Sequence, residues 1–346
     1  LYAEEAHQVL ADRLHTTRDI ALDLPYVSRA VIAAGKIDDF TSKSLIIDLL
    51  APMAILSTLE GQRSGIRTVG NHYSSPPLWG IGHGRGLAEI RSQVYDVIGR
   101  TPPTTSFLFT GADVDNLAVQ SETYQAMRVV ALVTAGVRGN AVRTSRDEGR
   151  FYEPGTINIL LLTNMKLTNR AMARAVVTAT EAKTAALQDL DVRSSESPRR
   201  YQATGTGTDN VLVVEGAGPP IDNTGGHSRM GELIARAVHR GIQEAVYRQN
   251  GMTPGRHIFH RLQERGIGIF GLLDKHACGC LPTDNTLQWA VEELLMESRY
   301  ADFIHSALAL SDDYEAGRVR DLSVFAKTCR LVAGEIAGRP IEDVED

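Results

Sequence analysis

The stretch from Pro154 to Asn210 decides the fold of this chain. Its three segments read Pro154-Gly-Thr-Ile-Asn-Ile-Leu-Leu-Leu-Thr-Asn164, Val177-Thr-Ala-Thr-Glu-Ala-Lys-Thr-Ala-Ala186 and Ala203-Thr-Gly-Thr-Gly-Thr-Asp-Asn210. They have the patterns of an apolar strand, an alanine- and threonine-rich helix and a glycine-threonine turn. Polar groups stand in them where a core normally has carbon, and burying such groups without partners costs about 1 to 3 kcal/mol. The stretch therefore predicts a site as well as a structural centre.

The first segment predicts a central strand over 156–163, covered on both faces because only Asn158 interrupts its apolar run. A helix over about 168–190 and a strand over 208–215 follow it. After Gly226, Ser228 is a good N-cap for a helix that continues to Tyr247. Strand and helix patterns thus alternate around the central strand.

Outward from this centre, hydrophobic patterns predict further strands. Two apolar runs, 44–50 and 53–59, follow one another, and a polar turn covers 60–65. A strand then returns over 66–73, which favours an antiparallel hairpin. The complete set of expected strands before the central one is 44–50, 53–59, 66–73, 105–110, 117–124 and 128–135. The fold class is α/β of the α+β type, with a layered mixed sheet flanked by helices and a helical C-terminal extension.

Three domains are expected along the chain. Residues 1–40 predict an N-terminal helical appendage, with an amphipathic helix over Glu4–Leu14 and a second helical piece near Tyr26–Ala34. Residues 41–250 form the main domain. Residues 251–346 predict a helical extension, with helices over 286–298 and 312–337.

Composition limits the function. The chain has 346 residues, 43% of them hydrophobic, a net charge of -6 and a pI near 6.0. The negative charge argues against nucleic acid and anionic membranes as partners, and no apolar run approaches the ~18 residues of a membrane span. Three cysteines are too few for a disulfide scaffold, so the cytoplasm is the expected compartment. The chain begins at Leu1, which leaves a removed leader and a trimmed chain both open.

Two motifs are weak evidence for cofactors. The glycine-rich loop Gly80-Ile-Gly-His-Gly-Arg-Gly86 precedes a helix over 87–98, but it lacks the Lys-Ser/Thr of a P-loop and a directly preceding strand. Cys278-Gly-Cys280 with His276 resembles part of a zinc site, yet only Cys329 supplies another sulfur, so no metal is expected.

The glycine-threonine turn is the first candidate site. In an extended strand, Thr204, Thr206 and Thr208 would present their hydroxyls on one face, with glycines on the other. The row could contact a flat ligand, or it could be a bulge or strand end rich in β-formers. Asp209 beside it could orient a hydroxyl or cap a turn.

The helix carries the second candidate group. Helical spacing places Thr180 and Lys183 on a common face, and Glu181 lies about 100 degrees around from Thr180. Charges on helices usually form a surface stripe, but alanines nearly encircle this helix, so Glu181 and Lys183 are expected to face a site.

Two further groups are polar residues in unusual positions. Asn158 and Thr156 share a face of the central strand, where they could fix a loop or contact a ligand. His227 precedes a helix N-cap, where the helix dipole favours its neutral form as a base or hydrogen-bond partner, although most single histidines are structural.

The same stretch resembles the adenosylcobinamide amidohydrolase family known as CbiZ. Three more motifs carry the resemblance: Thr68-Val-Gly-Asn-His-Tyr73, Val133-Thr-Ala-Gly-Val-Arg-Gly-Asn140 and Gly225-Gly-His-Ser-Arg-Met-Gly-Glu-Leu-Ile234. The similarity runs from about Ser44 to Val246. It implies a corrinoid-salvage enzyme that hydrolyses the aminopropanol amide of adenosylcobinamide to give adenosylcobyric acid and 1-aminopropan-2-ol. No cofactor is implied, since cobalt enters only with the corrinoid substrate, and the oligomeric state is left open, a homo-oligomer included.

Amide hydrolysis needs an activated nucleophile, a stabilised oxyanion and a protonated leaving amine. We therefore expect Glu181 as acid or base, Lys183 as its electrostatic partner, and Thr206 as nucleophile or oxyanion donor, with Asn140 and Asn158 as further donors. The complete set of expected substrate-binding residues is Asn71, His72, Asn140, Thr156, Asn158, Thr180, Thr204, Thr208, Asp209 and His227. Two alternatives remain: a corrinoid-binding protein without hydrolysis, and a threonine-nucleophile amidase that acts on other amides.

Overall fold

The computed structural model describes residues 15–148, 154–269 and 286–341. These residues form two compact units, one from the described parts of 1–196 and 202–255, the other from 197–201 and the described part of 256–346. The expected helix over Glu4–Leu14 lies outside the described residues. Among the helices that are described, none has the length and apolar character needed to cross a membrane.

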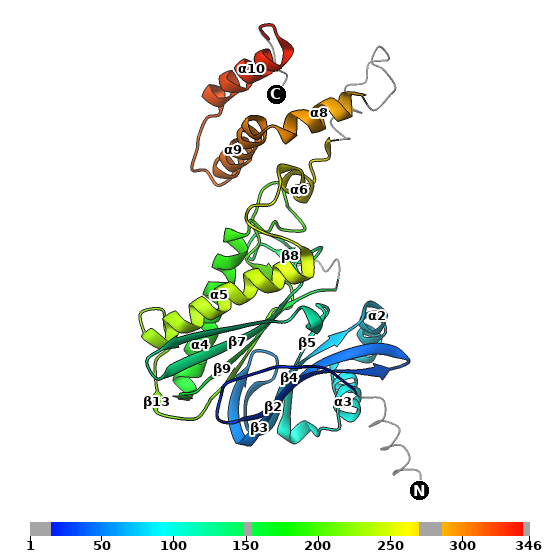
Figure 1. Ribbon diagram of the computed structural model, residues 1–346, viewed down its shortest axis with the longest axis vertical. Coiled ribbons are helices and arrows are strands. Elements are labelled where there is room, and N and C mark those ends of the chain that lie inside the picture. The colour runs from blue at the N-terminus through cyan, green and yellow to red at the C-terminus, as the bar shows by residue number, and fades with distance from the viewer. Residues whose placement is uncertain (1–14, 149–153, 270–285, 342–346) are drawn as a thin grey trace. The chain divides into compact units, whose positions relative to one another are not determined.

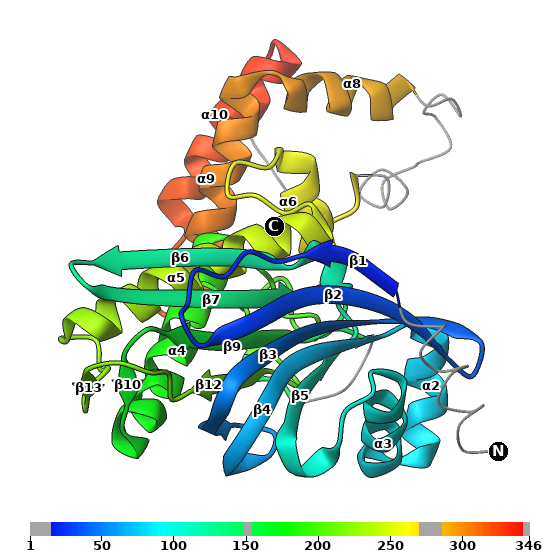
Figure 2. The ribbon, with the colours of Figure 1, turned by 60° about the horizontal axis from the view of Figure 1, so that its bottom comes forward.

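A mixed sheet, nine-stranded within the described residues, forms the centre of the first unit (Figures 1 and 2). Its main path is β1-β2-β3-β12-β9-β7-β6, while β4 pairs with β3 and with β5. Two neighbouring pairs are parallel, β4 with β5 and β9 with β12. The strands are β1 (His15–Asp19), β2 (Val27–Ile37), β3 (Phe40–Ser57), β4 (Gly61–Ser74), β5 (Thr105–Thr110), β6 (Ala118–Tyr124), β7 (Met127–Ala135), β9 (Ile157–Thr163) and β12 (Asn210–Val214).

The two halves of this sheet face each other. Leu160 and Leu162 of β9 pack in one core cluster with Leu45 and Ile47 of β3. The intervening residues of β9 face the opposite way, toward α4 (Asn169–Asp189) and α5 (Arg229–Asn250). Because β9 is buried on both faces, its sequence is apolar without alternation.

Two helices cover the outer face of the other half of the sheet, α2 (Pro76–Arg85) and α3 (Leu87–Val97) (Figure 2). Val94 and Tyr95 of α3 pack there against Phe107 of β5. The order of layers is therefore helices, sheet, sheet, helices. This arrangement confirms the predicted layered mixed sheet flanked by helices.

Most predicted elements of the main domain are present. The strands expected at 105–110, 117–124, 128–135 and 156–163 agree within one residue with β5, β6, β7 and β9. The expected hairpin is also confirmed, although the two runs before its turn form a single strand, β3, with irregular pairing between Asp48 and Met53.

Two predictions of local structure in the first unit are wrong. Residues Tyr26–Ala34 do not form a helix, because most of them belong to β2, which pairs along its length with β3. All five residues from Ala30 to Ala34 are buried, so the strand lacks the alternation that would have revealed it. The glycine-rich segment 80–86 is not a loop: most of it lies in α2, where Pro76 and Pro77 suit the first turn.

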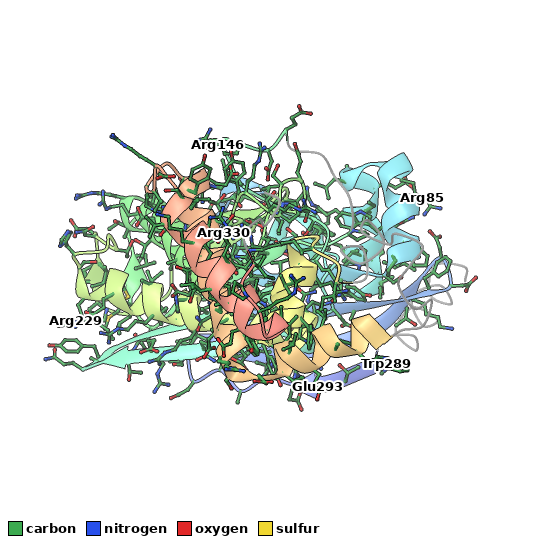
Figure 3. All side chains as sticks on the ribbon, turned by 90° about the horizontal axis from the view of Figure 1, so that it is seen from above. Arg85, Arg146, Arg229, Trp289, Glu293 and Arg330 are labelled. Atoms are coloured by element: carbon green, nitrogen blue, oxygen red, sulfur yellow. The ribbon has the colours of Figure 1, made fainter. Side chains whose placement is uncertain are left out.

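Side-chain caps begin the two long helices, and the one at Ser228 confirms the prediction. Thr168 accepts a hydrogen bond from the Ala171 amide at 3.2 Å, and Ser228 accepts one from the Gly231 amide at 3.0 Å. A Cβ on Gly231 would lie only 2.1 Å from the carbonyl oxygen of Gly225, so this turn of α5 accepts only glycine. Arg229, labelled in Figure 3, starts α5 and lies 4.3 Å over the Tyr124 ring.

The second unit is helical in its described residues. Its helices are α6 (Ile258–Glu264), α8 (Thr286–Met296), α9 (Ser298–Glu315) and α10 (Ser323–Ala337). Ile258, Leu262 and Leu295 form its small core. The single helix expected over 312–337 is wrong, because the chain leaves α9 through Gly317, whose φ is 71°.

Candidate active site at the edge of β9 and β12

The candidate site lies where the parallel strands β9 and β12 begin. Asn158 of β9 is opposite Asn210 of β12, and the residues just before each strand approach one another. A two-stranded ribbon, β8 (Ala141–Val142) with β11 (Gly205–Thr206), lies in the segments that lead into these strands. The site is thus assembled from the stretch 154–210 and the segment after β7.

The Asp209 carboxylate is the centre of this site. One oxygen accepts hydrogen bonds from the Thr206 hydroxyl at 2.5 Å and from the Ile157 amide at 3.2 Å. The other accepts from the Thr206 amide at 3.0 Å and from the ammonium of Lys183. The side chains of Lys183 and Asp209 are 10% and 15% exposed, so the ion pair is largely desolvated and stronger than a surface pair. Four donors therefore hold one carboxylate beside one hydroxyl.

Gly205 is required for this arrangement. A Cβ at this position would lie 2.3 Å from an oxygen of Asp209 and 2.6 Å from the Lys183 nitrogen. The neighbouring Gly207 differs, because a Cβ there would meet nothing within 4 Å. Only the first glycine of the motif is therefore fixed by the ion pair.

A second set of hydrogen bonds joins the segments that directly precede the two strands. The Thr156 hydroxyl donates to the Thr208 carbonyl at 2.6 Å, and the two hydroxyls are 2.9 Å apart. The Thr208 hydroxyl also contacts the carbonyl of Gly155 at 3.4 Å, and the side-chain amide of Asn140 donates to the same carbonyl. Asn140 is therefore tied to the same edge as Asp209.

Behind this edge, a network of buried hydrogen bonds lies between the two sheet halves. The Asn158 amide group donates to Asn71 Oδ1 at 2.8 Å and to the Phe109 carbonyl at 2.9 Å. Asn71 in turn donates to the Thr134 hydroxyl at 2.9 Å. Asn71 and Asn158 are fully buried. Their hydrogen bonds therefore fix β4, β5, β7 and β9 relative to one another.

The two asparagines expected as oxyanion donors already use their amide nitrogens. Both amide hydrogens of Asn158 are directed at acceptors, so Asn158 has none left to donate, while one of the two on Asn140 is directed at the Gly155 carbonyl. Instead, Oδ1 of each is buried without a hydrogen-bond partner among the described residues. For Asn158 the unused atom is thus an acceptor, which corrects its expected role as an oxyanion donor.

The threonine row also differs from the expected one. Only Gly205 and Thr206 are extended, and the chain then turns so that Thr206 meets Asp209. Thr204 contacts the Thr144 hydroxyl at 3.0 Å, while Thr208 contacts Thr156. The three hydroxyls therefore have three separate environments, because the turn breaks the strand period.

Four expected site residues are not brought to this group: Glu181, Thr180, His227 and His72. Glu181 is exposed and makes no hydrogen bond or ion pair within the described part of the chain. Thr180 is also exposed, and its hydroxyl bonds the Val176 carbonyl at 2.8 Å, within its own helix. His227 is exposed just before α5. Its neighbour Thr224 bonds the Ala171 carbonyl near the start of α4. Lys183 lies near the other end of α4, so His227 and Lys183 are apart.

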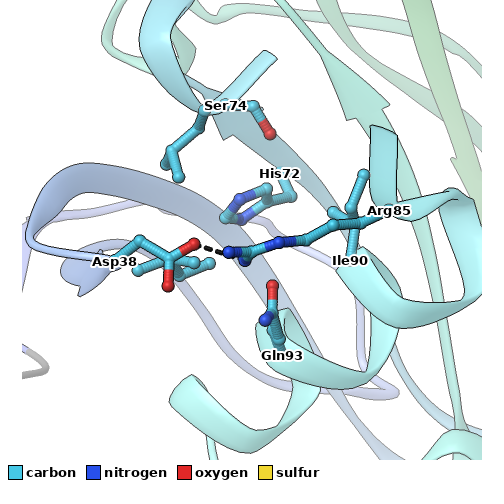
Figure 4. A pocket seen from close by; sticks show the side chains of 8 residues that line it. Asp38, His72, Ser74, Arg85, Ile90 and Gln93 are labelled. Atoms are coloured by element: carbon cyan, nitrogen blue, oxygen red, sulfur yellow. Dashed lines mark hydrogen bonds and ion pairs between the residues drawn. The ribbon is translucent and has the colours of Figure 1, made fainter. Parts of the chain in front are cut away.

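His72 lies on the other face of β4, beneath α2 and α3. Its Nδ1 is 2.9 Å from the Ser44 hydroxyl, and its Nε2 has no hydrogen-bond partner in the described structure. A cavity of about 20 Å³, room for one water, adjoins it and is bordered by Gln93 and the Arg85–Asp38 ion pair (Figure 4). Burial lowers the pKa of His72 to about 3, so the imidazole is neutral at physiological pH.

No metal centre is apparent in the described ranges, where no three His, Cys, Asp or Glu side chains cluster suitably. The candidate ligands His276, Cys278 and Cys280 lie outside the described residues.

Sequence reasoning missed Thr134 and Gly205, and it gave Asp209 only a supporting role. The signal for Asp209 was its position three residues after Thr206, since aspartate commonly accepts hydrogen bonds from nearby residues in a turn. Thr134 gave no such signal, because only the fold brings it to Asn71.

Comparison with known proteins agrees with the sequence motifs. A family model described as adenosylcobinamide amidohydrolase matches residues 28–254. An uncharacterized protein of Methanocaldococcus jannaschii, MJ1613, is 42% identical over 227 residues, which are 60% of this chain and 88% of that protein. A Methanosarcina mazei protein named adenosylcobinamide amidohydrolase is 31% identical over 149 residues, 40% of this chain and 64% of that one.

Among solved structures, the PH0078 protein from Pyrococcus horikoshii OT3 is similar at 13% identity and a TM-score of 0.31, over 68% of this chain and 83% of that one. This similarity is too low to carry an argument about fold or function.

Proposed function

The chain belongs to the adenosylcobinamide amidohydrolase family, and from that premise we propose that it cleaves the amide between the aminopropanol arm and the corrin ring of adenosylcobinamide. The products are adenosylcobyric acid and 1-aminopropan-2-ol. One observation carries the assignment of the reacting groups: the Thr206 hydroxyl donates to the Asp209 carboxylate at 2.5 Å, beside a largely buried lysine.

Thr206 is the nucleophile in this proposal. Its hydroxyl transfers a proton to Asp209 as Oγ1 attacks the amide carbonyl, which gives a tetrahedral intermediate. When the C–N bond breaks, the leaving amine takes the proton from Asp209. A water then hydrolyses the threonine ester, with Asp209 accepting its proton and returning one to Thr206. Thr206 is 7% exposed, and its neighbour Gly207 is exposed.

Lys183 supplies positive charge to the reaction. An ammonium group has three protons, and one of those on Lys183 is directed at Asp209. The other two have no acceptor among the residues that the structure describes, and they can donate to the oxyanion of the intermediate. Electrostatic stabilisation of this kind acts most strongly where water is excluded, and the Lys183 side chain is 10% exposed.

The neighbouring polar groups suit the substrate. The periphery of a corrin is rich in amides, which need hydrogen-bond partners when they leave water. Thr204 and Thr208 are partly exposed hydroxyl residues on either side of Thr206, and they can offer such partners. Asn71 and Asn158 act behind the site, because their side chains fix the strands that carry it.

The direct test is to incubate the protein with adenosylcobinamide and to identify products by mass spectrometry. We expect adenosylcobyric acid and free 1-aminopropan-2-ol in equal amounts, and we expect their formation to be lost in Asp209→Asn. The matched variant Glu181→Gln changes an exposed carboxylate of the same region and should retain activity. Tight binding of adenosylcobinamide without either product would contradict the proposal and favour a corrinoid-binding protein.

A further inference from the structure

Asn140 has a buried acceptor that its own fold leaves unused. The residue is 2% exposed, and its Oδ1 has no hydrogen-bond partner among the described residues. Rotating the side-chain amide by 180° would not give this oxygen a donor. The amide nitrogen already donates to the carbonyl oxygen of Gly155, and the rotation would place Oδ1 against that carbonyl, acceptor facing acceptor. A buried carbonyl without a donor is unfavourable, so the position is suited to a ligand that brings one.

Asn140 directly precedes the β8–β11 ribbon, as the last residue of the turn that leads into it. In that ribbon its neighbour Ala141 is opposite Thr206, and Val142 is opposite Gly205. The unused acceptor therefore belongs to the residue next to the position that faces the proposed nucleophile. The Asp209 carboxylate and the Lys183 ammonium lie against Gly205 of the same ribbon, because a Cβ on Gly205 would collide with both.

The same edge connects Asn140 to the threonine turn. Its amide nitrogen and the Thr208 hydroxyl meet at one carbonyl, that of Gly155. A Cβ on Gly155 would lie 2.8 Å from that amide nitrogen, so the glycine allows Asn140 to approach closely. The orientation of the side chain is therefore set by packing and by a hydrogen bond that a substrate does not need to supply.

We propose that Asn140 Oδ1 accepts the N–H of the scissile amide and so selects secondary amides over esters of the same shape. This inference rests on the proposed function, and it assigns Asn140 as a specificity-determining residue rather than a nucleophile or base. The N–H is the one feature of the reacting group that distinguishes an amide from an ester. A site that hydrogen-bonds such a group discriminates against an analogue without it, because the buried acceptor is then left unpaired.

The test compares two matched substrates across a small set of variants. The substrates are adenosylcobinamide and an ester analogue in which oxygen replaces the scissile N–H, made from adenosylcobyric acid and propane-1,2-diol. The proteins are the full-length wild type, Asn140→Ala, Asn140→Ser and the control Asn164→Ala. The control asparagine also uses its side chain to bond backbone, but it does so at the opposite end of β9.

We expect Asn140→Ala and Asn140→Ser to lower kcat/KM for the amide by about 10- to 100-fold and to leave kcat/KM for the ester nearly unchanged. The control should keep the wild-type ratio of amide to ester turnover. A purely structural role, in which Asn140 only fixes Gly155, would lower both substrates equally, and that result overturns the proposal. So does an unchanged ratio in folded Asn140→Ser, whatever happens to Asn140→Ala.

The outcome also separates this inference from the function on which it rests. If the wild type hydrolyses neither compound, the proposed function fails and the role of Asn140 fails with it. If the wild type hydrolyses the amide and the ratio does not respond to Asn140, only the role of Asn140 is overturned.

Discussion

Replacing Asp209 by asparagine tests whether its carboxylate organises the site. The substitution keeps the size of the side chain and removes its charge. In the wild type each carboxylate oxygen accepts two hydrogen bonds, from the Thr206 hydroxyl and Ile157 amide on one side and from the Thr206 amide and Lys183 on the other. An NH2 group in place of either oxygen therefore meets at least one donor that cannot reorient.

The expected cost follows from the burial of the pair. Breaking a buried ion pair by removing one partner costs about 3 to 5 kcal/mol, because the remaining charge is left without compensation. The Lys183 and Asp209 side chains are 10% and 15% exposed, so the cost lies at the lower end of this range. We expect Asp209→Asn to reduce the free energy of unfolding by about 3 kcal/mol and kcat/KM by about 10²- to 10⁴-fold, as for loss of a general base.

Urea unfolding followed by far-UV circular dichroism measures the first quantity. The matched control is Asp222→Asn, which removes a carboxylate from the exposed pair with Arg170, whose side chains are 74% and 67% exposed. Exposed pairs contribute little, so this variant should remain within about 0.5 kcal/mol of the wild type. If Asp209→Asn is as stable as Asp222→Asn, the carboxylate does not hold the site together and the reasoning is refuted.

Two further predictions concern other positions. Gly205→Ala should destabilise by about 1 to 3 kcal/mol and lose activity, because its Cβ would lie 2.3 Å from Asp209 and 2.6 Å from Lys183; Gly207→Ala, with nothing within 4 Å, should change little in the same assays. Because burial lowers the pKa of His72 to about 3, the unfolded chain binds a proton near pH 6.5 that the folded chain does not, and stability falls as pH drops from 6.5 toward 3. When the pH is lowered from 7 to 5, we expect the free energy of unfolding of His72→Gln to fall by about 2 kcal/mol less than that of the wild type, as measured by urea titration. Equal decreases in the two proteins would disprove that His72 is buried in its neutral form.

The centre of the fold could be predicted because local signals and tertiary structure agree there. The run at 156–163 is long and apolar enough to be a buried strand, and Thr168 and Ser228 are strong helix caps. The strand β2 was missed for the opposite reason: its middle is buried on both faces, so its apolar run lacks the alternation of a typical edge or surface strand.

The site could be located from the sequence more easily than its groups could be paired. Glu181 and Lys183 are two residues apart, and residues at that spacing do not share a helix face. The structure accordingly buries Lys183 against Asp209 and leaves Glu181 in solvent. The chain turn between Thr206 and Asp209 replaced the extended row, because the aspartate accepts both the amide and the hydroxyl of Thr206.

Contacts between distant segments could not be predicted from one sequence. Asn71 and Asn158 are far apart in the chain, and only the facing of the two sheet halves brings them to 2.8 Å. The orientation of the asparagine amides has the same origin, since it depends on carbonyls contributed by other strands. A polar residue in an apolar run shows that a partner exists, but it does not show which atom remains free.

The most direct test of the central claim is to look for a covalent bond between substrate and Thr206. Wild-type protein mixed with adenosylcobinamide is quenched in acid within one turnover, digested and analysed by mass spectrometry. The account predicts a corrinoid acyl ester on the peptide that contains Thr206, formed before free adenosylcobyric acid and absent in Thr206→Val, which should be inactive. Full activity of Thr206→Val, with product released and no ester at any time, would contradict it.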